Sequence, residues 1–465
     1  MENKKENFSE WYNEIVESAG LIDKRYPIKG MNIWMPYGLK VALNFDENVR
    51  RLCDAKGLNE VSFPLLITRK QLNVEFEHLK GFEKQVFWIT KGGTDKLDEE
   101  MSLRPTSESA MYPMFAMWIR THGDLPLKLY QLVSVYRYET KHTRPFLRDR
   151  EFRFFEAHTA HRNYQEAEAE IVEYLDIWKS LSDILCVPYV LHRRPEWDKF
   201  AGAEYSNAAD TFLPSNRSLQ VATFHQYGTN FSKPYDITYV NEAGEKEYVH
   251  QTTYGMSSRL IGALVGIHGD DKGLILPPDL APTQVIIIPI PSEKSDTLKY
   301  SMNLEKILSS KGIRARVDSR DSYTPGYKYN DWEMRGVPVR IEVGEREVAA
   351  NTATIAMRVE KGKKTVGLKD LEDSVRDSLR RVKEIITDKA VKQMKKIVKV
   401  AAAMNDLIAW KGPSLSYWCG LRECSDHIEE KSEKVCLGYR IDVESAGNCV
   451  VCGKEGRLAT FSRTY

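Results

Sequence analysis

The chain has 465 residues, of which 42% are hydrophobic and 29% are charged, and its formal net charge at pH 7 is +1. This composition is typical of a globular protein with roughly two to four domains, and it gives nucleic acid no overall electrostatic attraction. No run of about 18 apolar residues and no apolar signal segment are present, so we expect a cytoplasmic protein without a membrane span.

The first 90 residues predict two helices followed by an edge strand. Residues 8–19 have amphipathic helical spacing, and residues 44–56 fit a second helix that Gly57 ends. Residues 61–67 have a strand pattern that contains Pro64, and proline in a strand is confined to edges or bulges. An edge covered by a partner subunit and an edge bulge in a monomer explain Pro64 equally well. Residues 77–82 are a loop before a predicted strand at 85–90.

The segment Ser-Leu-Arg-Pro-Thr-Ser-Glu at residues 102–108 precedes an apolar run. A Ser or Thr cap and a Glu in the first turn are helix-start signals, so Thr106 and Glu108 have a purely structural explanation. A carboxylate such as Glu108 also suits a buried cationic ligand.

Two antiparallel strands joined by a cationic loop are predicted between residues 127 and 161. Apolar and polar residues alternate at 127–136 and at 152–155, on either side of a charged loop at 139–150. The loop contains Lys141, His142, Arg144, Arg148 and Arg150, which also fit a solvated hairpin tip. Arg137 lies inside the first strand, where an unpaired guanidinium is very costly. It needs a partner, and a bound carboxylate or phosphate would match its paired donors.

These segments together resemble a known family. Arg137-Tyr-Glu139, the basic loop and Arg150-Glu151-Phe152 resemble motif 2 of the class II aminoacyl-tRNA synthetases. The segments at 103–108, 141–145 and 156–159 narrow the resemblance to the prolyl-tRNA synthetases of the archaeal and eukaryotic type. The resemblance covers nearly the whole chain, and several independent motifs occur in the expected order.

The resemblance implies a fold and an activity. The fold would be an α+β catalytic domain, built on the antiparallel sheet and helices of class II synthetases. The enzyme would join L-proline to AMP from ATP, with Mg²⁺ on the phosphates, and transfer the prolyl group to tRNA(Pro). A homodimer would form through the motif 1 region near Pro64, and residues 77–82 would cover the amino-acid pocket.

The resemblance also implies roles for individual residues. The proline site would contain Thr106, Glu108, Arg137, Glu156, His158 and His225. The ATP site would contain Arg137, Glu139, Leu147, Arg148, Phe152, Gln220, Thr223, Ser257 and Arg259. Arg137 and Arg259 would be the catalytic pair that stabilises charge at the α-phosphate. A satisfied core histidine is the ordinary alternative for His158.

A helix at 163–185 and strands at 208–213, 219–224 and 235–240 are predicted next. The segment Gln220 to His225 resembles the family segment that contacts ATP and proline, but Phe224 replaces a small serine. The following Gln226-Tyr-Gly-Thr-Asn230 also departs from the family pattern. Because residues alternate across a strand, Phe224 would pack on the face opposite His225; otherwise the amino-acid pocket is altered.

Residues 254–264 resemble motif 3, in which a strand and a small-residue turn precede an arginine that opens a helix. The helix dipole disfavours a cation such as Arg259 at this end. An anion bound at the same helix N-terminus would explain it, so Ser257 and Arg259 are candidates for the triphosphate site.

Strands alternate with helices from residue 285 to 343, which predicts an α/β domain with a mostly parallel sheet. This region resembles the anticodon-binding domain of the family, with Glu333 and Arg340 as candidates for the anticodon guanines. A structural Glu–Arg pair is the alternative. Residues 376–399 carry nine Lys or Arg against three acids, which indicates a solvated face or weak phosphate contact.

The C-terminal region contains two close cysteine pairs, Cys419 with Cys424 and Cys449 with Cys452. Four thiolates would close the shell of a tetrahedral structural Zn²⁺, although Cys436 lies between the pairs and could compete. We therefore expect a catalytic domain at 1–282, an anticodon-binding domain at 283–385 and a small zinc-binding domain at 386–465. The alternative to an active synthetase is a catalytically silent, tRNA-binding paralogue, which Phe224 favours.

Overall fold

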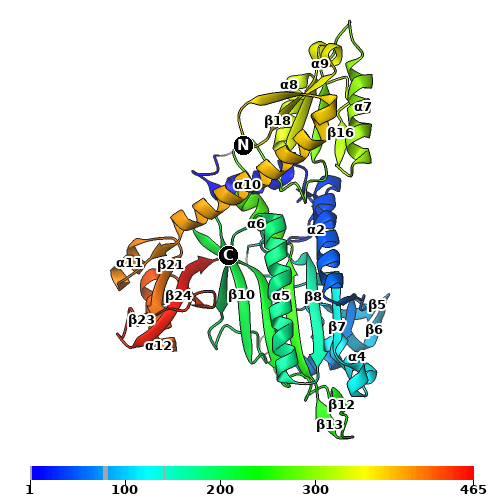
Figure 1. Cartoon of the computed structure of the whole chain (residues 1–465). Coiled ribbons are helices and arrows are strands. Elements are labelled where there is room, and N and C mark those ends of the chain that lie inside the picture. The colour runs from blue at the N-terminus through cyan, green and yellow to red at the C-terminus, as the bar shows by residue number, and fades with distance from the viewer. Residues whose placement is uncertain (1–2, 77–81, 141) are drawn as a thin grey trace.

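The structure, a computed structural model, describes residues 3–76, 82–140 and 142–465. A large sheet with helices on one face carries an α/β domain at one end and a smaller C-terminal part at its side (Figure 1). Most of the predicted loop at 77–82, and Lys141, lie outside the described residues. Among the described residues, no helix combines the length and apolarity needed to cross a bilayer.

Six antiparallel strands form the centre of the large sheet, in the order β9-β10-β11-β14-β8-β7. Their bounds are β7 Leu127–Tyr136, β8 Glu151–His161, β9 Val190–Arg193, β10 Tyr205–Phe212, β11 Arg217–Gly228 and β14 His250–Ser257. The pairing of β7 with β8 runs from Leu127 opposite Ala160 to Tyr136 opposite Glu151. The two strands predicted around the cationic loop are therefore confirmed.

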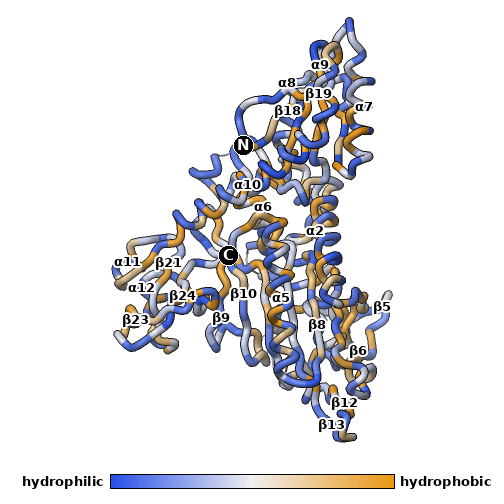
Figure 2. The backbone as a smooth tube through the Cα atoms, in the orientation of Figure 1, coloured by the Kyte–Doolittle hydropathy of each residue, from blue (hydrophilic) through white to orange (hydrophobic). Residues whose placement is uncertain are grey.

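Four helices pack on one face of this sheet and form the main core with it. They are α1 Phe8–Ser18, α2 Pro36–Ala55, α5 Tyr164–Leu185 and α6 Arg259–His268. The α5 helix begins after Asn163, whose side chain accepts from the Glu166 amide, and ends at Cys186 in the left-handed conformation. The α6 helix is hydrophobic along most of its length (Figure 2).

Gly262 permits the close packing of α6 on its neighbours, because it has no side chain. A Cβ added at Gly262 would lie 2.6 Å from Leu147 Cδ2 and 3.0 Å from the Tyr12 hydroxyl oxygen. The close approach holds α6 against the loop between β7 and β8. The start of α6 therefore lies beside the cationic loop, which positions the candidate site.

The region before β7 differs from its prediction. The α2 helix begins at Pro36 rather than residue 44, because proline suits the first helical position, where no amide donor is needed. Residues 61–65 form no strand, and Pro64 lies between the two-residue β3 (Asn59–Glu60) at the sheet edge and β4. A separate three-stranded sheet follows, made of β4 Leu66–Thr68, β5 Trp88–Gly92 and β6 Asp95–Leu103. Helices α3 Arg69–Phe76 and α4 Glu108–Trp118 flank its strands in the sequence.

The α/β region contains a five-stranded sheet in the order β16-β15-β17-β18-β19. Its elements are β15 Val285–Pro289, α7 Thr297–Ser310, β16 Ala315–Val317, α8 Pro325–Met334, β17 Val339–Val343, α9 Glu345–Ala350, β18 Thr352–Met357 and β19 Lys363–Gly367. The first three strands are parallel, as predicted, but β18 and β19 pair antiparallel. The prediction of a mostly parallel sheet is correct only for β15–β17, because a short hairpin can join only antiparallel strands.

The C-terminal part extends the large sheet. Helix α10 (Leu371–Ile397) leads into β20 Lys399–Val400, α11 Met404–Ala409, β21 Ser414–Trp418, α12 Arg422–Ser432, β22 Val435–Arg440, β23 Ala446–Asn448 and β24 Glu455–Thr464. Strand β22 pairs with β9 and the end of β24 pairs with β11, so one 12-stranded sheet includes both parts. The final residue, Tyr465, thereby reaches the sheet centre.

Candidate active site

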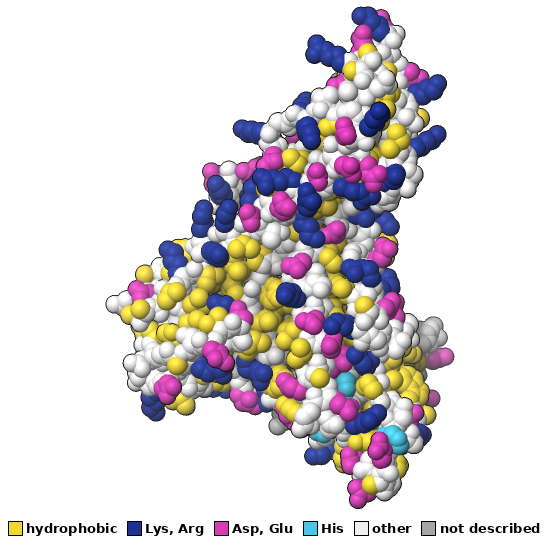
Figure 3. Space-filling model, viewed as in Figure 1, with side chains coloured by type: hydrophobic (Ala, Val, Ile, Leu, Met, Phe, Trp, Pro, Cys, Tyr) yellow, Lys and Arg dark blue, Asp and Glu magenta, His cyan; other side chains and the backbone are white. Residues whose placement is uncertain are grey.

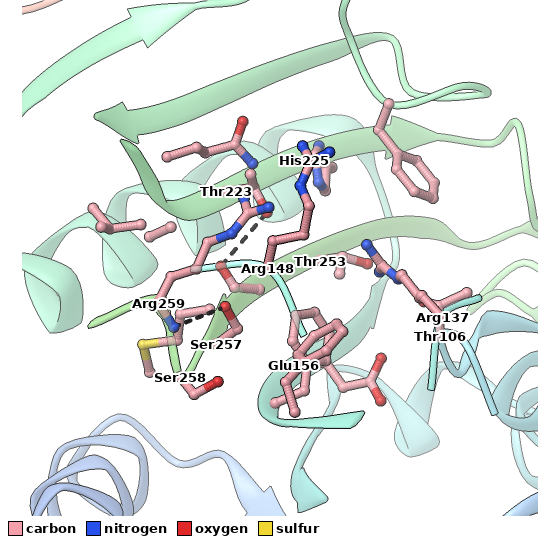
Figure 4. Close-up of a pocket in the computed structure, with 18 of the residues that line it drawn as sticks. Thr106, Arg137, Arg148, Glu156, Thr223, His225, Thr253, Ser257, Ser258 and Arg259 are labelled. Carbon is pink, nitrogen blue, oxygen red and sulfur yellow. Dashed lines mark hydrogen bonds between the residues drawn. The ribbon is translucent and has the colours of Figure 1, made fainter. Parts of the chain in front are cut away.

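A cavity of about 370 Å³ lies over the strands β8, β11 and β14 and the start of α6 (Figure 4). Thirteen of the fourteen predicted proline and ATP residues line it: Thr106, Glu108, Arg137, Glu139, Leu147, Arg148, Phe152, Glu156, Gln220, Thr223, His225, Ser257 and Arg259. His158 is fully buried behind the wall instead. The structure therefore brings the two predicted sets together in one cavity.

Glu108 is the candidate group for a cationic ligand. It is 2% exposed and is the first residue of α4, where the helix dipole favours a negative charge. One carboxylate oxygen accepts from the Thr106 hydroxyl, and the other accepts from the Tyr227 hydroxyl at 3.0 Å. The helix-start interpretation and the ligand interpretation are thus compatible, since the cap region also faces the cavity.

A buried polar network lies beneath Glu108. Glu156 accepts from the Ser107 hydroxyl and, at 2.9 Å, from the Gln131 amide, and its other oxygen lies 3.2 Å from His158 Nε2. Burial opposes protonation of His158, but the hydrogen bond to Glu156 and the charge of Glu108 raise its pKa. His158 Nδ1 is 3.1 Å from the Tyr112 hydroxyl. Glu108, Glu156 and His158 are close enough to hold a metal ion, yet these contacts already engage Glu156 and His158.

Three arginines line the cavity, with Arg137 beside Thr106 and Arg259 on the opposite side (Figure 4). Arg137 donates to the Pro105 carbonyl at 3.2 Å, and its guanidinium lies over the Phe152 ring at 5.5 Å. Arg259 donates to the Leu147 carbonyl at 3.1 Å, and Arg148 lies 3.8 Å from a Glu139 oxygen. Burial, with the charges of Arg137 and Arg148, lowers the pKa of Arg259 to about 10. The repulsion of Arg259 by Arg137 and Arg148 favours a polyanion bound in this cavity.

The turn before α6 adds further anion-binding groups. Ser257 ends β14 and accepts from the Arg259 amide at 3.3 Å, while Ser258 occupies the cap position without a side-chain cap bond. Backbone N–H groups at a helix N-terminus bind phosphate readily. The geometry predicted for motif 3 is therefore present.

Phe224 does not alter the cavity. Its side chain is fully buried and stacks on Tyr254, with ring centroids 4.8 Å apart, in the core beneath the helices. The expectation that it packs opposite His225 is confirmed. His225 lines the cavity, and its Nδ1 lies 2.7 Å from the Ser206 hydroxyl.

Two groups that hold predicted site residues in place were not predicted from the sequence themselves. Tyr227 holds Glu108, and Arg194 holds Gln220 by donating to its amide oxygen at 2.9 Å. Arg194 also donates to Asp210 and to the Leu437 carbonyl of β22, both at 2.8 Å. Residues 226–230 depart from the family pattern, and this departure could have drawn attention to Tyr227. No feature of the sequence distinguishes Arg194.

The four predicted zinc ligands lie together. Cys419 Sγ is 3.7 Å from Cys424 Sγ and 3.6 Å from Cys452 Sγ, and all four sulfur atoms are within 4.8 Å of one another. Tetrahedral Zn²⁺ with bonds of about 2.3 Å places its sulfur ligands roughly 3.8 Å apart, so the four thiols fit this ion. Cys436 is buried outside the group.

The two candidate anticodon residues also meet. Arg340 Nη1 on β17 lies 3.5 Å from Glu333 Oε1 on α8, and its guanidinium covers the Tyr329 ring at 4.2 Å. Arg340 also pairs with Glu342 at 3.0 Å. The pair is both internally satisfied and part of the lining of a small surface pocket, so the structural alternative and the binding role are compatible.

Comparison with known proteins agrees with this geometry. Residues 87–268 match the model of the tRNA synthetase class II core domain (G, H, P, S and T), and residues 284–378 match that of the anticodon binding domain. The fold and the site thus define a class II aminoacyl-tRNA synthetase. A proline–tRNA ligase of Thermoplasma volcanium is 58% identical over 465 residues, which is the full length of both chains. The chain belongs to the prolyl-tRNA synthetase family, as the sequence resemblance indicated.

Two solved structures are also similar. The prolyl-tRNA synthetase of Cryptosporidium parvum, complexed with halofuginone and AMPPNP, has a TM-score of 0.94 at 33% identity and covers 100% of this chain and 99% of its own. The Giardia lamblia prolyl-tRNA synthetase in complex with prolyl-adenylate has a TM-score of 0.94 at 31% identity and covers 99% of each chain. The similarity therefore includes all three parts of the fold.

Proposed function

We propose that this chain activates L-proline with ATP and transfers the prolyl group to the 3′ end of tRNA(Pro). One observation carries the proposal: a single cavity is lined by the buried Glu108 carboxylate and by the guanidinium groups of Arg137, Arg148 and Arg259. An amino acid and a nucleotide triphosphate offer the matching charges, namely an ammonium, a carboxylate and phosphates. Charging of tRNA(Pro) with labelled proline tests the whole reaction, and failure with an active-site-titrated enzyme would refute it.

The proposed mechanism uses position and charge. Glu108 and Thr106 hold the proline ammonium, and Arg137 orients the proline carboxylate so that its oxygen attacks the α-phosphorus as pyrophosphate leaves. Arg148 and Arg259 hold the phosphates, while Phe152, Glu139, Gln220 and Thr223 hold the adenosine part. The negative charge that develops at the α-phosphate is stabilised by Arg137 and Arg259. Mg²⁺ bound with ATP would supply further charge neutralisation on the phosphates.

A silent paralogue has less support. Phe224 was the feature that favoured it, and Phe224 is buried on the far face of the sheet. Thr106, Glu108, Arg137 and Arg259 all line the cavity, so the groups needed for adenylate formation are available.

If Arg340 binds the anticodon, its loss should weaken tRNA binding without slowing the activation of proline. We expect Arg340→Met to raise the KM for tRNA(Pro) about 5- to 150-fold, because a bidentate arginine–guanine contact contributes about 1–3 kcal/mol. Proline-dependent ATP–pyrophosphate exchange should stay at the wild-type rate, since it needs no tRNA. Lys299→Met removes an exposed charge from α7 of the same domain and serves as the control. An unchanged KM for tRNA(Pro) would contradict the anticodon role and mean that Glu333 and Arg340 form only a structural pair.

The four cysteines are proposed to hold one structural Zn²⁺. We expect Cys449→Ser to lose the zinc and to destabilise the C-terminal part, because structural zinc contributes directly to folding. Since β22 and β24 continue the catalytic sheet, exchange activity should fall with the zinc content. Metal analysis and thermal denaturation measure both effects. Cys436→Ala should retain zinc; loss of zinc there would mean that Cys436 is a ligand instead.

The remaining proposals concern assembly and location. We propose a cytoplasmic homodimer that uses the region around Pro64, where Leu65 and Leu66 are 40% and 42% exposed. Figure 3 shows further hydrophobic side chains gathering over the middle of the viewed face, whereas charged side chains are dispersed over the anticodon-binding domain.

The division at residues 282/283 and 385/386 is our proposal for the domain boundaries.

A further inference from the structure

Tyr227 lies one layer behind the proposed proline site. It is on β11, is fully buried, and does not line the cavity, yet its hydroxyl donates to Glu108 Oε1 at 3.0 Å. An ionised carboxylate has no hydrogen to give, so the phenol must be the donor in this bond. Burial and the charge of Glu108 raise the pKa of Tyr227 well above its ordinary value, so the donor proton stays in place.

Glu108 is thereby held at both oxygens. Thr106 donates to Oε2 and Tyr227 donates to Oε1, so the plane of the carboxylate is fixed by two neutral donors. Each carboxylate oxygen has two lone-pair directions, so each keeps capacity to accept from a ligand in the cavity. The two neutral hydroxyl groups compensate the buried charge of Glu108 only in part. A cationic ligand in the cavity would supply the rest of the compensation.

The Tyr227 ring is held independently of its hydroxyl. The ring packs on Phe231, with centroids 4.4 Å apart, and lies parallel to the His225 ring at 6.0 Å. Phe200, which lines the cavity, is a further neighbour at 5.7 Å. Replacement by phenylalanine therefore removes the donor and leaves the aromatic packing in place.

We infer that Tyr227 is a positioning residue for amino-acid recognition, which fixes the Glu108 carboxylate in the orientation that accepts the secondary ammonium of proline. The inference rests on the proposed function and deepens it, because it assigns a role to the segment at 226–230 that departs from the family pattern. Tyr227 acts through Glu108 and touches no substrate.

The test compares Tyr227→Phe with the wild-type full-length chain in ATP–pyrophosphate exchange. We expect the KM for proline to rise on the order of tenfold, because a hydrogen bond to a charged group is lost. The KM for ATP and the melting temperature should remain close to wild type. Tyr239→Phe is the matched control, because Tyr239 is also buried and donates to a glutamate, Glu247, at 2.8 Å in the β12–β13 hairpin (Thr238–Val240 and Lys246–Tyr248).

A second ligand separates positioning from general damage to the pocket. Tetrahydrofuran-2-carboxylate has the ring and carboxylate of proline but an ether oxygen in place of the ammonium, so it cannot donate to Glu108. Its inhibition constant should be the same for Tyr227→Phe and wild type. Equal weakening of both ligands, or an unchanged KM for proline, would overturn the inference. Absence of proline-dependent exchange in the wild type would instead refute the proposed function.

Discussion

Replacing Arg137 with alanine is expected to lower proline-dependent ATP–pyrophosphate exchange by about 10³-fold or more. Arg137 ends the pairing of β7 with β8 and extends its guanidinium along the Phe152 ring into the cavity. From there it would serve the proline carboxylate before attack and the α-phosphate during attack. Removal of one group that stabilises developing charge commonly costs about 10²–10³ in rate, and Arg137 would also lose its orienting role.

The Arg137→Ala variant should remain folded. The Arg137 side chain donates to the Pro105 carbonyl, while the backbone hydrogen bond from the Arg137 amide to the Arg150 carbonyl needs no side chain. Circular dichroism and the melting temperature check the fold, and Arg376→Ala, which removes an exposed arginine of α10, is the control. Exchange at a near wild-type rate in a folded Arg137→Ala chain would contradict the mechanism.

Replacing Arg259 with methionine is expected to have two effects of opposite sign. Exchange should fall by about 10²–10³-fold, because a cation at the phosphates is lost. The free protein should become more stable, with a melting temperature a few degrees higher, because Arg137, Arg148 and the positive end of α6 all repel Arg259. The wild-type chain tolerates this repulsion because function requires it.

Ligand binding should reverse the order of stability. ATP or inorganic pyrophosphate stabilises the wild-type chain by mass action, and Arg259→Met should lose most of that effect. Thermal denaturation with and without pyrophosphate measures both quantities. Arg259→Lys, which keeps the charge without the planar donors, should melt like wild type and retain part of the activity. A lower melting temperature for free Arg259→Met would show that Arg259 is structural.

The cavity residues could be predicted from the sequence where their position follows from a local motif. Arg137, Arg148 and Phe152 are fixed by one strand–loop–strand unit, and Arg259 by a strand that turns into a helix. His158 shows the limit of local pattern, because it shares a strand face with Glu156 but lies deeper, under Tyr112 of α4. Alternation gives the face of a strand and leaves open which element covers it.

Features that depend on long-range pairing were not predictable. Tyr227 and Glu108 are 119 residues apart, and the pairing of β22 with β9 joins segments more than 240 residues apart. The same pairing brings the Leu437 carbonyl to Arg194 and so connects the C-terminal part to Gln220. Proline is common both in turns and at the first position of a helix, and at Pro36 the packing of α2 on the core selects the helix start.

The most direct measurement is amino-acid-dependent ATP–pyrophosphate exchange on the purified, zinc-loaded chain, with each common amino acid tested in turn. The cavity that joins Glu108 to the three arginines predicts exchange with proline, well above every other amino acid of the set. The absence of exchange with any amino acid, in a folded chain, would contradict the proposed activity and leave a tRNA-binding role.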